Sequence, residues 1–84
     1  MRYRAVPRFY FHLLNDVDAS DEEGKELPDL EAARRHAIQN LRFTAAEMIK
    51  EQGKLVPGHC INIEDASGNV LDSVSVADVV KIED

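Results

Sequence analysis

The chain has 84 residues, 44% of them hydrophobic, which is enough apolar content for one small folded domain and too much for a disordered chain. No apolar run approaches the roughly 18 residues of a membrane-spanning helix, and the single cysteine excludes an internal disulfide framework and suits a reducing cytoplasm. The formal net charge is −6, and eight of the sixteen acids lie between residues 16 and 31, so repulsion of phosphate argues against a nucleic-acid partner. We expect one cytoplasmic domain over residues 1–84, with residues 1–7 as a loosely ordered tail and no contact with a membrane or nucleic acid.

Residues 8–14, Arg-Phe-Tyr-Phe-His-Leu-Leu, alternate in character and are rich in aromatic side chains, which predicts a half-buried strand. Its two faces are Phe9, Phe11 and Leu13 on one side and Arg8, Tyr10, His12 and Leu14 on the other. A short extended piece at residues 24–27 is expected to return against this strand.

Residues 29–52 form the most regular pattern in the chain. Asp29 is suited to cap the start of a helix, and Gly53 is suited to end it. At 100° per residue the apolar positions gather into one stripe that must face a sheet. The stripe consists of Leu30, Ala33, Ala37, Ile38, Leu41, Ala45, Met48 and Ile49. Arg34 falls inside it, and we expect Arg34 to pair with an acid of the preceding loop such as Asp21 or Glu23.

The last third of the sequence predicts a hairpin. Residues 59–64 and 70–74 alternate like strands, and residues 65–69 have the composition of a turn. Ser75 and Asp78 then match a capping pattern, which predicts a helical turn through Val80. The expected fold class is α+β, with one long helix packed on one face of a three- to four-stranded antiparallel sheet and a short C-terminal helical turn.

Four short sequence motifs resemble those of one protein family. They are His12-Leu13, then Asp21-Glu22-Glu23-Gly24-Lys25-Glu26-Leu27-Pro28-Asp29, then Ala33-Arg34, and Ile63-Glu64-Asp65-Ala66-Ser67-Gly68-Asn69-Val70-Leu71. Together they resemble small uncharacterised bacterial proteins, frequent in rhizobia and related alphaproteobacteria, that are catalogued as a domain of unknown function. The resemblance spans residues 8–80 and implies a cytoplasmic bacterial protein, but it implies no activity and no catalytic residue.

The acidic loop at residues 16–23 invites comparison with a calcium loop, with Asp16, Asp18, Ser20 and Glu22 as its candidate ligands. An EF-hand loop needs glycine at its sixth position and a bidentate glutamate at its twelfth. Counted from Asp16, those positions hold Asp21 and Leu27. The pattern therefore favours a solvated acidic loop over a calcium site.

A zinc site is not expected either. His12, His59 and Cys60 are the candidate ligands, but the chain lacks a Cys-x-x-Cys or His-x-x-x-His spacing. His59 and Cys60 are adjacent, so on a strand they point to opposite faces. We interpret Cys60 as a packed small side chain and expect no metal or cofactor.

A single long helix leaves the other face of the sheet uncovered. Tyr10, His12 and Asn62 are expected on that face, together with Cys60 and Glu64. An interaction surface and a plain solvated face remain alternatives there.

Phe43 is a large apolar residue outside the apolar stripe of the predicted helix. It lies about 220° from Leu30 on the helical wheel, almost opposite the apolar stripe. Its expected neighbours on that side are His36, Gln39, Glu47 and Lys50. This arrangement indicates a contact with the same helix of a second subunit, the alternative being that the N-terminal tail covers the ring.

No glycine-rich phosphate loop, nucleotide signature or Ser-His-Asp order is present, so the sequence gives no basis for an enzyme. The first hypothesis is a non-catalytic protein-interaction or regulatory domain that self-associates as a homodimer or binds another protein. The alternative is a small-molecule or metal-ion binding domain that uses the acidic loop or the Tyr10/His12 face. An enzyme would need a pocket that holds His12 beside an acid such as Glu64.

Overall fold

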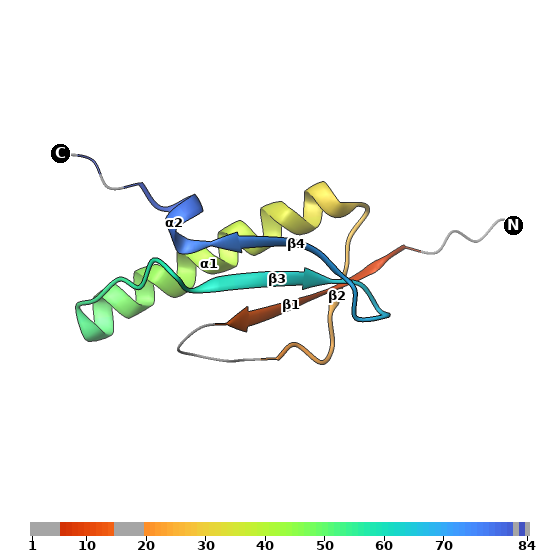
Figure 1. Ribbon diagram of the computed structural model, residues 1–84, viewed down its shortest axis with the longest axis horizontal. Helices are drawn as coiled ribbons and strands as arrows, with labels where there is room; N and C mark the ends of the chain where they lie inside the picture. Colours follow the sequence, from red (N-terminus) through yellow and green to blue (C-terminus); the bar gives the residue numbers. More distant parts are fainter. Residues whose placement is uncertain (1–5, 15–19, 82, 84) are drawn as a thin grey trace, which may run out of the picture.

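The structure is a computed structural model that describes residues 6–14, 20–81 and 83. Its elements are β1 (Arg8–Leu14), β2 (Lys25–Glu26), α1 (Leu30–Gln52), β3 (Cys60–Glu64), β4 (Val70–Ser75) and α2 (Val76–Val79). The long helix lies on one face of a four-stranded antiparallel sheet, and the short helix follows the last strand (Figure 1). The predicted α+β architecture is confirmed. Residues 1–5 of the predicted tail lie outside the described residues.

The strand order is β2-β1-β3-β4, with every neighbouring pair antiparallel. Phe11 lies opposite Ile63, and Ile61 lies opposite Leu13 on one side and Val74 on the other. Because side chains alternate along a strand, these apolar residues share one face and form the floor on which α1 packs.

The helix begins and ends where its capping residues predict. The Asp29 carboxylate accepts a hydrogen bond from the Ala32 N–H at 2.8 Å. Gly53 adopts a left-handed conformation with φ of 67°, and its N–H donates to the Ile49 carbonyl at 2.9 Å. Between these ends, Ala33, Ala37 and Leu41 are fully buried against the sheet. The small alanines let the helix approach the strands closely, so the core is thin and depends on this approach.

Two residues of the predicted apolar stripe are exposed to solvent. Leu30 is 39% exposed and Ile49 is 49% exposed. The reason is length: a helix of 23 residues spans roughly 35 Å. The longest strand has seven residues and spans only about 23 Å. Both ends of the helix therefore extend beyond the sheet.

The helix is offset toward the β4 side of the sheet, so it packs mainly on β3 and β4 and contacts β1 less closely (Figure 1). Two arginines hold that side: Arg34 pairs with the Asp72 carboxylate at 2.7 Å, and the Arg42 Nε donates to the Val79 carbonyl at 3.1 Å. The prediction that Arg34 pairs with Asp21 or Glu23 is therefore wrong. That flank of the helix faces β4, and the acidic loop lies beside β1 at the other side.

In the part of the chain that the structure describes, no helix has the length and apolar character needed to cross a membrane.

Candidate functional site

An open groove runs between α1 and β1, because the helix is offset away from that strand. It consists of two adjoining hollows of about 250 and about 270 Å³ that share Leu13, Phe43 and Thr44. We call it the helix–strand groove. Its floor is Phe11, Leu13, His59 and Ile61, its helix wall is Asn40, Phe43, Thr44, Glu47, Met48, Glu51 and Gln52, and Ser20 and Asp21 border its β1 side.

Phe43 is 67% exposed, as its wheel position predicts, and its ring stands at the lip of both hollows. A large apolar side chain thus meets solvent directly beside a surface that already contains Leu13 and Met48. Exposed apolar area next to an apolar concavity is typical of a contact surface.

The other interaction residues predicted on the helix are divided between the groove and the solvent. His36 was expected beside Phe43 on the outer face, but it lies half-buried with its ring at 4.7 Å from that of Phe11 in an edge contact. The same burial, together with the Lys25 charge, lowers the pKa of His36 below its ordinary value. Glu47 lies on the groove wall and Gln39 is exposed. The offset of the helix explains the difference for His36, since it turns that flank toward β1.

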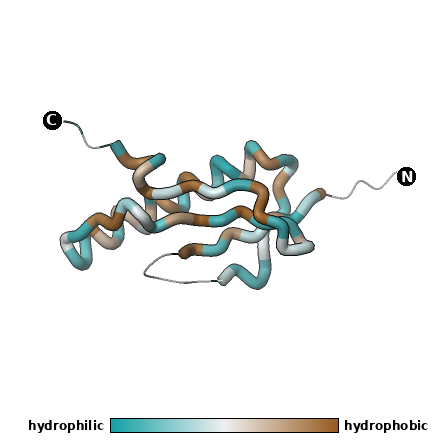
Figure 2. Tube along the Cα trace, viewed as in Figure 1, coloured by the Kyte–Doolittle hydropathy of each residue, from teal (hydrophilic) through white to brown (hydrophobic). Residues whose placement is uncertain are grey.

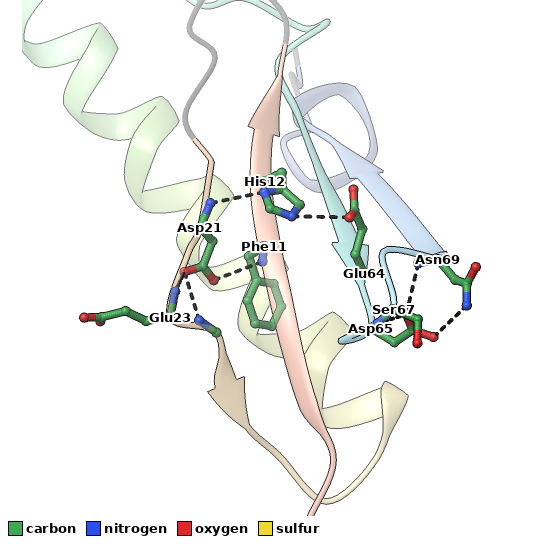
Figure 3. A network of polar contacts seen from close by, with 9 residues as sticks. Phe11, His12, Asp21, Glu23, Glu64, Asp65, Ser67 and Asn69 are labelled. Atoms are coloured by element: carbon green, nitrogen blue, oxygen red, sulfur yellow. Dashed lines mark hydrogen bonds and ion pairs between the residues drawn. The ribbon is translucent and has the colours of Figure 1, made fainter.

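The acidic loop has a structural role that centres on Asp21. Its carboxylate accepts hydrogen bonds from the N–H groups of Phe11 at 3.1 Å, Glu23 at 3.2 Å and Gly24 at 3.1 Å (Figure 3). Burial acts to raise the pKa of Asp21, but these hydrogen bonds outweigh it and hold the pKa below its usual value. The carboxylate therefore occupies the edge of β1 where a neighbouring strand would otherwise bond.

The calcium candidates are not brought together. Asp16 and Asp18 lie outside the described residues, and Ser20 and Glu22 are exposed. Within residues 6–14, 20–81 and 83, no three His, Cys, Asp or Glu side chains converge in a way that could hold a metal ion.

The uncovered face of the sheet does bring its predicted residues together. His12 lies opposite Asn62, and Tyr10 lies opposite Glu64. The His12 Nδ1 accepts a hydrogen bond from the Asp21 N–H at 3.1 Å, and its Nε2 lies 3.4 Å from the Glu64 carboxylate (Figure 3). Because Nδ1 needs a lone pair to accept, this arrangement places the Nε2–H toward the Glu64 carboxylate.

His59 and Cys60 point to opposite faces of the sheet, as expected. His59 is 1% exposed and lies at the floor of the groove, whereas Cys60 is half-buried. Sequence reasoning missed Leu13, Thr44, Met48 and Glu51 as groove residues. Thr44, Met48 and Glu51 lie one, five and eight positions after Phe43, on the flank between it and the core, so the wheel position of Phe43 is the signal that could have found them.

A family model described as "Domain of unknown function (DUF6894)" matches residues 8–77. The chain belongs to the DUF6894 family. Searches of curated proteins and of solved structures find no match.

In this DUF6894 chain, residues of the motifs that carry the family resemblance have structural roles. Asp21 binds the β1 edge, and the Asp65 carboxylate accepts from the N–H groups of Ser67 and Asn69 to close the hairpin turn. Gly24 has φ of 70°, and a Cβ at this position would meet the Phe9 carbonyl oxygen at 2.9 Å. The hydrophilic segment that precedes β2 and runs back beside β1 (Figure 2) is thus part of the fold.

Proposed function

We propose that this DUF6894 protein is a non-catalytic protein-interaction or regulatory domain that self-associates through the helix–strand groove. The observation that carries the proposal is the exposure of Phe43 beside an apolar hollow. Covering an exposed phenylalanine ring stabilises a complex by roughly 1.5–3 kcal/mol, so the surface gains from a partner.

The hollow is large enough for the same ring from a second copy. It measures about 250 Å³. A cavity of about 150 Å³ is known to bind benzene. The side chains that line it are mainly apolar at the floor and polar at the rim, which is the usual composition of a protein contact surface.

A non-catalytic role is supported by how the reactive groups are used. The Asp21 carboxylate is occupied by three backbone N–H groups, and both nitrogens of His12 face protein atoms. These groups hold the loop to the sheet.

The first test is the solution mass of the wild type and of Phe43→Ser by light scattering. We expect the wild type to have twice the 9.4 kDa chain mass and Phe43→Ser to have the mass of one chain. Ile49→Ser is the matched control, because Ile49 is also an exposed apolar residue of α1 but lies outside the groove lining, and it should leave the dimer intact. A wild-type monomer, or a dimer indifferent to Phe43→Ser, contradicts the proposal.

A second candidate function is the binding of a small polar ligand or a metal ion, at the acidic loop or on the uncovered sheet face. The grouping of Tyr10, His12, Asn62 and Glu64 on one face favours the second location. We expect a ligand of this kind to raise the melting temperature of the wild type and to have less effect on Asn62→Ala. Calcium, zinc and a metabolite panel are the probes, and a flat response across all of them rules the candidate out.

The proposed setting is the bacterial cytoplasm. The single cysteine, Cys60, supports a reducing compartment, and the motifs that carry the family resemblance support an alphaproteobacterial source.

A further inference from the structure

The row of residues on α1 that contains Phe43 has opposite charges on the two sides of the ring. Residues four apart on a helix form a ridge, and the ridge through Phe43 consists of Glu31, Arg35, Gln39, Phe43, Glu47 and Glu51. Its segment from Arg35, whose side chain is 67% exposed, to the exposed Glu51 is centred on Phe43. Within this segment the ridge is basic before the ring and acidic after it, and Glu31 lies one turn further out, beside Arg35.

Such a ridge is complementary to itself in one orientation. When two identical helices pair antiparallel about a two-fold axis, each residue before the centre faces the residue equally far after it on the other copy. With the axis at Phe43, Arg35 faces Glu51 and Gln39 faces Glu47 of the second copy. A parallel pair would instead place Arg35 against Arg35 and Glu51 against Glu51, which repel.

We propose that the partner in the helix–strand groove is a second copy of this chain whose α1 runs antiparallel to α1, with Arg35 of each copy facing Glu51 of the other. The inference rests on the proposed self-association and adds to it the orientation and the residues that select the partner. From Arg35 to Glu51 the ridge is roughly 24 Å long. Helices that cross at about 20° remain in contact over such a length.

The neighbours of the ridge are compatible with this pairing. Arg35 already lies 3.8 Å from Glu31 on its own helix, and a guanidinium has enough donors to hold a second carboxylate. His36 faces Lys50 of the second copy in this register. Its burial against Phe11, with Lys25 nearby, lowers the pKa of His36, so the neutral ring at pH 7 does not repel that lysine.

The test uses two charge reversals, Arg35→Glu and Glu51→Arg, studied alone and mixed. In each variant alone, both ridge pairs become repulsive, and we expect the dimer dissociation constant to rise about tenfold. In the equimolar mixture one chain carries two acids and the other carries two bases at these positions. The mixed dimer should therefore form with about the tightness of the wild type.

Lys54→Glu makes the same change of charge as Arg35→Glu, on an exposed residue beyond the end of the helix, and should leave the dimer unchanged. In about 1 M salt the Debye length is only about 3 Å, so the difference between each single variant and the wild type should shrink. Circular dichroism of each variant checks that the chain is folded.

The outcomes separate this inference from the proposed function. A dimer that is lost in Phe43→Ser but is insensitive to both charge reversals overturns the antiparallel pairing and leaves the self-association in place. A mixture that dimerises no better than the single variants also overturns the pairing. A wild type that is monomeric overturns both.

Discussion

Replacing Gly24 by alanine is expected to lower the free energy of unfolding by about 3 kcal/mol. Gly24 has φ of 70°, a conformation that costs other residues roughly 1–2 kcal/mol. The added Cβ would also lie 2.8 Å from the Arg8 Cγ, 2.9 Å from the Phe9 carbonyl oxygen and 2.9 Å from the Tyr10 Cε2. The Arg8 side chain can move aside, but the Phe9 carbonyl belongs to β1 and cannot.

Gly53→Ala is the matched control for this experiment. Gly53 has nearly the same backbone conformation, with φ of 67°, but among the described residues no atom lies within 4 Å of the position that a Cβ would take there. Gly53→Ala should lower the free energy of unfolding only by the cost of the left-handed backbone conformation, about 1–2 kcal/mol. Urea denaturation of both variants measures the difference. Equal losses would show that the contact of Gly24 with β1 contributes nothing.

Replacing Asp21 by alanine is expected to destabilise the protein by about 2–3 kcal/mol at pH 7, because hydrogen bonds to a charged group are the stronger kind and three are lost together. The N–H of Phe11 loses its partner at the β1 edge, and those of Glu23 and Gly24 lose the contact that closes the loop. Glu22→Ala, an exposed neighbour in the same loop, should change the stability by less than about 0.5 kcal/mol. An equal effect of the two substitutions would contradict the role assigned to Asp21.

The loss in Asp21→Ala should also depend on pH. The pKa of Asp21 is lower in the folded protein than its ordinary value of about 4, since its hydrogen bonds outweigh its burial. The unfolded chain therefore binds the proton more readily, and the stabilisation by Asp21 is complete above about pH 4 and is lost as the pH falls through the folded value. Asp65 and Asp72 also have lowered pKa values, but both proteins contain them, so their effect cancels in the difference. Unfolding free energies at pH 7 and pH 3 should show a smaller gap between wild type and variant at pH 3.

The interactions that sequence reasoning predicted are those between residues close in the chain. The alternation of Phe9 and Phe11 predicted a strand, and the capping types of Asp29 and Gly53 predicted both ends of the helix. The exposure of Phe43 also followed from a local period, because its angle to the apolar stripe depends only on helix geometry.

The partners of single polar side chains could not be predicted in the same way. Arg34 was assigned to the wrong acid, and the contact of His36 with Phe11 was not predicted, although both positions on the helix were known. Both have the same cause, because no local sequence pattern predicts where the helix lies across the sheet. An offset toward β4 brings Arg34 to Asp72 and turns His36 onto Phe11.

The sequence by itself determined the elements, their bounds to within about one residue, the face of each strand that is buried and the exposure of Phe43. These depend on periods of two and 3.6 residues and on capping within four residues, so they are readable along the chain. Only the tertiary structure decided the strand order, the role of Asp21 at the β1 edge and the existence of the helix–strand groove. Those features join residues ten or more positions apart. They depend on where the long helix packs across a sheet whose strands differ in length.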